Sequence, residues 1–284
     1  MIIPSVFSEQ ILFQTIRLEC NGLVGTGFIL GFEIQKDLHI PIVVTNKHVI
    51  DYQPISHVLF SLHVKDSNGA ILEKTADYDW KSEWLFHPDD TIDLCCTLFK
   101  PIIDVASQNG LNLFFHTCPD SFIPTEEVLN DLQTVNDIIM VGYPDGLYDE
   151  KHCLPLVRKG MTATHPSIDF NGQPEGVIDI GCIYGSSGSP IYSYPGLYHY
   201  NKSNGFTLAN YNPILYGIFY GMACTDIEGK VLTNKVVGHK HYAAGKKNNG
   251  KTTTEVPINI GYYIKAKELR VFKDLIISKY GIVQ

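Results

Sequence analysis

The chain is organised around the stretch Gly185-Ser186-Ser187-Gly188-Ser189-Pro190, which lies between two apolar runs. Glycines on both sides of Ser187 allow the backbone to turn sharply and to present a hydroxyl without side-chain crowding. The turn also leaves the N–H groups of Gly185 and Ser187 free to point at one spot. An exposed hydroxyl beside two such donors suits a nucleophile in acyl transfer. Taken alone, the hexamer also fits an ordinary Gly/Ser turn between two strands.

A histidine and an aspartate farther upstream favour the nucleophile interpretation. His48 closely follows the strongly β-branched segment 39–45, and Asp93 opens the apolar segment 93–99. Each of them alone would most often be structural, but with Ser187 they give the order His, Asp, Ser. His48 would take the proton of Ser187 as general base and return it to the leaving amine. Asp93 would hold the imidazole in the required tautomer and stabilise its charged form.

Other local patterns compete with this interpretation and are less consistent with the chain. Asp89 and Asp90 are rivals to Asp93, but they lie in a loop, whereas the strand expected after Asp93 would place its carboxylate rigidly. The hexamer is not the Gly-x-Ser-x-Gly elbow of α/β-hydrolases, which place their aspartate and histidine after the serine. The adjacent pair Cys95-Cys96 has no partner pair at zinc spacing, so we expect no metal site and no cofactor.

Short apolar segments alternate with turn residues along most of the chain, which predicts an all-β protein built as barrels or a sandwich. In the first half we expect strands at 11–19, 28–30, 39–45, 58–64, 71–72 and 93–99. In the second half we expect strands at 138–141, 153–157, 161–164, 177–180, 190–192, 214–220 and 259–264. Only the segment 265–278 predicts a helix, because its apolar residues recur at steps of three and four.

These segments together resemble the trypsin/chymotrypsin-like serine peptidases, in particular the bacterial branch that includes the high-temperature-requirement proteases. The resemblance spans nearly the whole chain in the family's order and rests on residues 25–30, 43–49, 92–94, 141–146, 185–190, 217–221 and 261–263. It implies two six-stranded antiparallel β-barrels with a C-terminal α-helix, and the triad His48, Asp93 and Ser187 in the cleft between the barrels. The single peptidase unit 1–284 would comprise a first barrel at 10–120, a linker at 121–136, a second barrel at 137–264 and a helix at 265–279.

The resemblance also implies roles for the backbone around the triad. The N–H groups of Gly185 and Ser187 would form the oxyanion hole. The segment Ile218-Phe219-Tyr220-Gly221 would pair its backbone with a bound peptide as an added strand. Gly181 would lie at the base of the primary specificity pocket.

Two departures from the family shape the expected activity. Digestive members carry an aspartate before the nucleophile that captures a new N-terminus on activation, and here that position is Ser186, so we expect no activation by zymogen cleavage. No acid stands at Gly181, and Lys202 is the only formal charge from Ile180 to Thr225. We therefore expect a neutral residue, apolar or aromatic, before the cleaved bond. Eight of the sixteen tyrosines lie between 184 and 220, where they could equally cover the end of the barrel.

The composition of the 284-residue chain narrows the function classes. With 44% hydrophobic and 18% charged residues, the chain is typical of a globular protein. The net charge of −8 argues against nucleic-acid binding, and the absence of a run of 18 apolar residues argues against a membrane partner. The first residues show no secretory signal, and the seven cysteines are an odd number without a CxxC pair. We therefore expect reduced thiols and a cytoplasmic protein, and the resemblance points to a bacterial one.

Two functions from different classes stay open on these grounds. The first is a serine endopeptidase that hydrolyses protein or peptide substrates through an acyl-enzyme. The second is a catalytically silent two-barrel binding module, because an apparent triad can be mispositioned. The segment 226–251 carries six lysines against two acids and would be a solvated loop or a gate or docking surface for an acidic partner. The sequence is also compatible with a separate activating or targeting protein.

Overall fold

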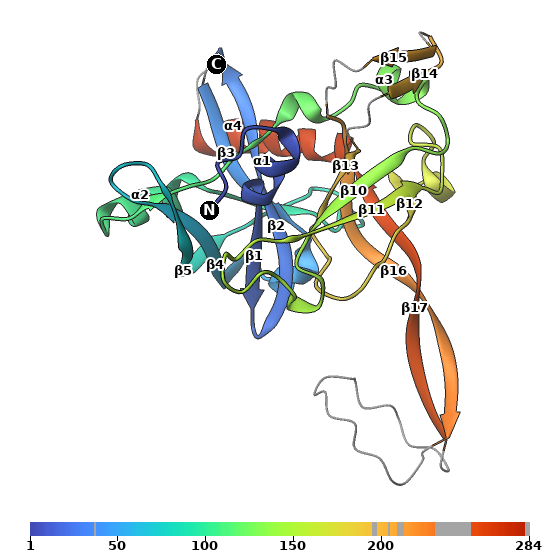
Figure 1. Cartoon of the computed structure of the whole chain (residues 1–284), viewed down its shortest axis with the longest axis horizontal. Coiled ribbons are helices and arrows are strands. Elements are labelled where there is room, and N and C mark those ends of the chain that lie inside the picture. The colour runs from blue at the N-terminus through green and yellow to red at the C-terminus, as the bar shows by residue number, and fades with distance from the viewer. Residues whose placement is uncertain (37, 195–197, 204, 209–212, 231–250, 282–284) are drawn as a thin grey trace.

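The computed structural model describes residues 1–36, 38–194, 198–203, 205–208, 213–230 and 251–281. Within these ranges the strands form one large sheet, one closed barrel and a small two-stranded sheet (Figure 1). This arrangement confirms the all-β class that the sequence predicts.

The first half of the chain forms a nine-stranded sheet. Its continuous order is β5-β4-β1-β2-β3-β7-β6, with β8 paired to β4 and β9 paired to β2. The strands are β1 (Thr15–Cys20), β2 (Leu23–Gln35), β3 (Leu38–Thr45), β4 (Ile55–Lys65), β5 (Ile71–Glu83), β6 (Leu85–Phe86), β7 (Cys95–Leu98), β8 (Asn112–Leu113) and β9 (Cys118–Pro119). The sheet has more strands than the six expected here, because the two-residue strands β6, β8 and β9 also pair with it, and β5 is longer than the segment 71–72 expected for it.

The second half forms a closed six-stranded antiparallel barrel in the order β10-β11-β12-β17-β16-β13. Its strands are β10 (Asp137–Gly142), β11 (Leu156–Thr162), β12 (Glu175–Asp179), β13 (Pro190–Ser193), β16 (Leu215–Lys230) and β17 (Lys251–Lys265), and β14 (Tyr198–Asn201) pairs separately with β15 (Gly205–Leu208). One strand, β11, replaces the two strands expected at 153–157 and 161–164. Figure 1 shows that β16 and β17 continue beyond the barrel as a long two-stranded ribbon.

Four helices occur in the described residues: α1 (Phe7–Gln14), α2 (Lys100–Gln108), α3 (Glu126–Asp131) and α4 (Arg270–Tyr280), with α4 preceded by the 3-10 turn η5 (Ala266–Leu269). The C-terminal helix is therefore confirmed, whereas the other three were not expected. The strand predicted at 11–19 is wrong over its first four residues, which are helical. The Glu9 carboxylate accepts hydrogen bonds from the backbone N–H groups of Ser5 and Val6, which satisfies free donors at the start of α1.

The sequences of α2 and α3 contain helix-start signals, but both helices are too short to show a clear helical periodicity. Pro101 lies in the first turn of α2, where a missing N–H does no harm. The Thr125 hydroxyl accepts a hydrogen bond of 3.3 Å from the Val128 N–H and so caps α3. This helix lies in the segment 121–136 that was expected to be a polar linker.

One apolar core joins the two halves of the molecule. It contains buried residues of the first sheet, of the barrel and of α4, among them Phe28, Leu30, Val44, Val141, Tyr192, Ile218, Ile264, Phe272 and Ile276. Each half also has a core of its own. The shared core holds the two sheets in a fixed relation, so that residues from both can build one site.

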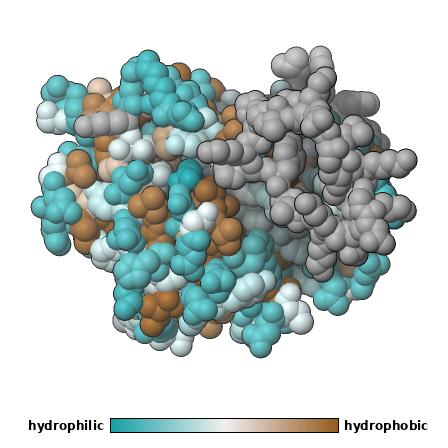
Figure 2. Space-filling view, turned by 90° about the horizontal axis from the view of Figure 1, so that it is seen from below, coloured by the Kyte–Doolittle hydropathy of each residue, from teal (hydrophilic) through white to brown (hydrophobic). Residues whose placement is uncertain are grey.

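The surface gives no sign of a broad apolar face on the side seen in Figure 2. Hydrophilic residues dominate the coloured part of that view, and the apolar residues form separate small patches. Among the described residues, no helix has the length and apolar content needed to cross a bilayer.

Candidate active site

His48 and Asp93 are brought together by the pairing of β3 with β7. These strands are antiparallel, with Thr45 opposite Cys95, so the residues just after β3 meet those just before β7. His48 lies in the 3-10 turn η1 (Lys47–Ile50), and its Nδ1 is 2.5 Å from the Oδ2 of Asp93. The backbone N–H of His48 donates to the other carboxylate oxygen over 3.2 Å. The carboxylate thus orients the imidazole and leaves Nε2 available as a proton acceptor.

The two rival aspartates have other surroundings. The Asp89 carboxylate accepts hydrogen bonds from the hydroxyl and the N–H of Thr91, and these bonds lower the pKa of Asp89. Asp90 is exposed. Among the described residues, the carboxylate that reaches His48 is that of Asp93.

The turn that carries Ser187 packs against the ends of β2 and β3. The N–H of Thr26 donates to the Ser187 carbonyl over 2.9 Å, and the Thr26 hydroxyl donates to the Gly185 carbonyl over 3.0 Å. The Thr45 hydroxyl in turn donates to the Thr26 carbonyl over 2.7 Å. Because β3 leads directly from Thr45 into the turn of His48, the candidate nucleophile and the candidate base lie at the same junction of the two halves.

Two glycines make this close approach of the Ser187 turn sterically feasible. Gly185 and Gly188 have φ angles of +80° and +85°. A Cβ at Gly188 would lie 1.8 Å from the Thr26 carbonyl oxygen, and one at Gly185 would lie 2.5 Å from the Tyr143 carbonyl oxygen. Both positions therefore require glycine for the backbone conformation and for the space.

The backbone amides of the turn divide into two groups. The N–H groups of Ser186, Gly188 and Ser189 donate to carbonyls within the protein. Those of Gly185 and Ser187 donate to no acceptor among the described residues. The two unused donors are the pair for which an oxyanion hole was predicted.

The Ser187 side chain is half-buried, and its hydroxyl makes no hydrogen bond with the part of the chain that the structure describes. A hydrogen bond between Ser187 and His48 is therefore not formed here. Hydrogen bonds of this kind are often long in ligand-free sites and tighten when substrate binds. The structure thus pairs His48 with Asp93 directly and places the Ser187 turn at the same junction.

The predicted peptide-binding segment is available only in part. Ile218 is buried and pairs with β17, and Phe219 uses both its N–H and its C=O in hydrogen bonds with the Ser187 turn. The backbone of these two positions is paired within the protein, so the strand-addition prediction rests on Tyr220 and Gly221. Beyond Ile218, no described strand pairs with β16 on the side of β13. The open edge therefore begins at Tyr220 and continues through Gly221.

Gly181 is exposed, and a Cβ built on it would meet no atom within 4 Å, so there is open space above it. The sequence reasoning missed a residue beneath it, Arg158 on β11. Its Nη1 donates to the Gly181 carbonyl over 2.7 Å and to the Ser186 hydroxyl over 3.0 Å. Burial lowers the pKa of Arg158 to about 10, so the guanidinium is still charged at neutral pH. Arg158 lies outside the segment 180–225, in which Lys202 is the only formal charge, and an arginine within a barrel strand was the available signal.

Most of the lysine-rich segment 226–251 falls on residues 231–250, which lie outside the described residues. Its described ends belong to β16 and β17, where the ribbon projects from the barrel. The expectation of a gate or docking surface in that segment stays a prediction.

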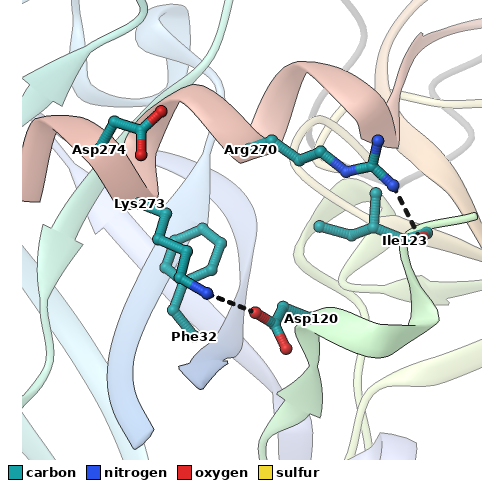
Figure 3. Close-up of a pocket in the computed structure, with 6 residues that line it drawn as sticks. All are labelled: Phe32, Asp120, Ile123, Arg270, Lys273 and Asp274. Carbon is teal, nitrogen blue, oxygen red and sulfur yellow. Dashed lines mark hydrogen bonds and ion pairs between the residues drawn. The ribbon is translucent and has the colours of Figure 1, made fainter. Parts of the chain in front are cut away.

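A cavity of about 250 Å³ lies away from this junction, between β2, the 3-10 turn η2 (Asp120–Phe122) and α4 (Figure 3). Arg270 of α4 donates to the Ile123 carbonyl over 3.3 Å, and Lys273 lies 3.5 Å from the Asp120 carboxylate. These contacts fasten α4 to the chain between the two halves, and the cavity contains none of the predicted site residues. Among the described residues, no group of three or more His, Cys, Asp or Glu side chains is placed to hold a metal ion.

No protein-family model matches the chain, and no curated protein matches it. Among solved structures, the chain is similar to the inactive form of the Rv3671c protease from M. tuberculosis H37Rv. A serine-to-alanine mutant gives a TM-score of 0.41 and a second structure gives 0.39, each with 14% identity over 96% of this chain and 91% of that chain. The chymotrypsin-like fold expected from the sequence is confirmed by the closed six-stranded barrel, the second sheet and the C-terminal helix.

Proposed function

We propose that the protein is a serine endopeptidase that hydrolyses protein or peptide substrates through His48, Asp93 and Ser187. One observation carries the proposal: the Ser187 turn, with its two unused amides, packs against the end of β3, where Asp93 orients His48. This junction gathers a hydroxyl, an oriented imidazole and two donors for a developing negative charge, which are the groups that acyl transfer needs.

In the proposed reaction, Ser187 Oγ attacks the carbonyl carbon of the peptide bond while its proton passes to His48 Nε2. The N–H groups of Gly185 and Ser187 bind the oxyanion, and a single such donor is worth about 10²–10³-fold in kcat. The C–N bond then breaks as His48 gives the proton to the leaving amine, which leaves an ester on Ser187. A water molecule gives its proton to His48 and attacks this ester, and the C–O bond breaks with return of the proton to Ser187.

We propose that the substrate lies as an added strand along the open edge at Tyr220 and Gly221, with the side chain before the cleaved bond over Gly181. We propose a neutral side chain, apolar or aromatic, at this place, because no acid stands at Gly181 to hold a basic one and the Arg158 Nη1 is already used by the Gly181 carbonyl and the Ser186 hydroxyl. The expectations of no activation by N-terminal capture, of a cytoplasmic location and of an activating or targeting protein belong to the same proposal. In support of a reducing compartment, Cys224 is exposed as a free thiol and the other six cysteines are buried as free thiols.

The test is the intact mass of the protein after incubation with a fluorophosphonate. We expect one adduct on the wild type and none on Ser187→Ala. Ser167→Ala is the matched control, because the Ser167 hydroxyl lies 3.0 Å from a histidine nitrogen of His165 yet has no predicted role. Loss of the adduct in the control but not in Ser187→Ala would contradict the proposal. The absence of any adduct on folded wild type would favour the catalytically silent binding module instead.

A further inference from the structure

The proposed reaction assigns no role to Arg158, although its guanidinium contacts the segment that carries Ser187. It comes from β11, and its guanidinium reaches the segment that runs from Gly181 to Ser187 at two points, the Gly181 carbonyl and the Ser186 hydroxyl. Ser186 is completely buried, and it stands between the two residues whose amides are unused, Gly185 and Ser187. The bond to the Ser186 hydroxyl therefore supports the turn between these two amides, whose peptide groups also accept hydrogen bonds at the Tyr184 and Ser186 carbonyls from the N–H groups of Asp145 and Ser189.

The charge of Arg158 is not neutralised by its surroundings. No described Asp or Glu forms an ion pair with it, and its Nε and Nη2 are buried without a hydrogen-bond partner. Removing a cation from water without a counter-charge is unfavourable for folding. A neutral side chain would fill the same space at lower cost, so the cation calls for an explanation beyond packing.

Other contacts hold the ends of the turn but leave the Ser186 side chain to Arg158. The Asp145 N–H donates to the Tyr184 carbonyl over 2.5 Å, and Thr26 binds the carbonyls of Gly185 and Ser187. All these hydrogen bonds are accepted by backbone carbonyls of the turn. Among the described residues, the side-chain hydroxyl of Ser186 is bonded by Arg158.

We propose that Arg158 is a positioning residue that holds the Ser187 turn in its oxyanion-binding form, which makes the site self-sufficient without capture of a new N-terminus. This inference rests on the proposed function for its catalytic consequence. Its positive charge also lies beneath the turn whose amides face the developing oxyanion, and so it favours the same charge distribution. Arg158 touches neither the substrate nor the reacting atoms in this scheme.

The experiment compares Arg158→Met, Arg158→Lys and the control Lys159→Met. Lys159 is the neighbouring cation on β11, but its side chain is 53% exposed and pairs with Asp137. We expect amide hydrogen exchange in residues 181–188 to speed up at least tenfold in Arg158→Met and to stay at the wild-type rate in Lys159→Met. We expect fluorophosphonate labelling to slow by about 10–100-fold in Arg158→Met, partial rescue in Arg158→Lys, and a fall in kcat with little change in KM.

The outcomes separate this inference from the proposed function. A wild type that takes no fluorophosphonate refutes the proposed function, whereas hydrogen exchange in residues 181–188 still decides whether Arg158 holds the turn. Unchanged exchange in Arg158→Met refutes the positioning role, as does a change confined to KM. If Arg158→Met does not fold, Ser186→Ala removes the same hydrogen bond from the other side and must give the same local increase in exchange.

Discussion

The two halves of the molecule contribute to the candidate site by different means. The first sheet contributes side chains, since His48 and Asp93 hold each other by two hydrogen bonds at the joined ends of β3 and β7. The barrel contributes mainly backbone, since the Ser187 turn is shaped by two glycines with positive φ and by carbonyls that accept hydrogen bonds. Side-chain contacts can be removed one atom at a time, whereas a backbone turn tolerates almost no added volume. The same site should therefore respond very differently to substitutions in its two parts.

The largest effect is expected at Gly188. In Gly188→Ala, the new Cβ would meet the Thr26 carbonyl oxygen at 1.8 Å on a backbone with φ of +85°. We expect a loss of more than about 3 kcal/mol in the free energy of unfolding and no fluorophosphonate labelling. Gly22→Ala is the control, because its φ is +78° but nothing lies within 4 Å. Urea denaturation of both should give about 1–2 kcal/mol for Gly22→Ala, and equal losses would mean that the turn does not pack as described.

Asp93→Asn tests the side-chain half of the comparison. The amide keeps the shape of the carboxylate but favours the wrong imidazole tautomer, so we expect labelling to slow by about 10³–10⁴-fold. The free energy of unfolding should change much less than in Gly188→Ala. Asp89→Asn is the matched control, since that carboxylate bonds Thr91, and its labelling rate should equal that of the wild type. If Asp89→Asn slows labelling more than Asp93→Asn does, Asp89 would be the triad aspartate instead of Asp93.

Thr26→Val tests the link between the two halves. The Thr26 hydroxyl donates to the Gly185 carbonyl and accepts from the Tyr143 N–H, so its loss leaves two barrel groups without partners. We expect a cost of about 1–3 kcal/mol and a labelling rate reduced about tenfold. Thr97→Val removes a hydroxyl that bonds Glu83 within the first sheet alone. Thr97→Val should lower the melting temperature without slowing the labelling. Slower labelling in Thr97→Val would show that the slowing in Thr26→Val is not specific to the junction of the two halves.

The smallest expected effect is a pH dependence of stability that originates at His63 of β4, whose ring nitrogen Nε2 lies 2.9 Å from the His152 carbonyl oxygen. Burial lowers the pKa of His63, whose side chain is 5% exposed, below the value of about 6.5 in an unfolded chain. Below that pH the unfolded state binds the proton first, so stability falls as pH drops through about 6.5 toward the folded pKa. Denaturation at several pH values should show this slope in the wild type and a smaller slope in His63→Gln. An equal slope in both would assign the effect to other groups.

The parts of the site that the sequence could predict are those set by local chemistry. Ser187 with its glycines and His48 after a β-branched strand are visible in the sequence because each needs a particular residue type at a particular spacing. The preference for Asp93 over Asp89 also followed from local order, since a strand fixes its first residues better than a loop does.

The parts that the sequence could not predict depend on contacts between distant segments. Arg158 reaches Gly181 and Ser186 from another strand, and nothing in its neighbours signals that contact. Phe219 was expected to be free for a peptide, but its N–H and C=O are used by the Ser187 turn, which only the barrel closure reveals. The helix α1 was hidden because its apolar residues also fit a strand, and the deciding bonds come from Glu9 at its start.

The open edge of β16 at Tyr220 determines which side chains of a bound substrate would face the protein. A peptide paired with that edge points its side chains alternately toward and away from the barrel. The residue before the cleaved bond would face the space above Gly181, its predecessor would face away, and the one before that would return to the barrel side. In a cleavage profile, amino-acid selectivity should therefore alternate between high and low at successive substrate positions, because side chains of a pleated strand alternate between its two faces.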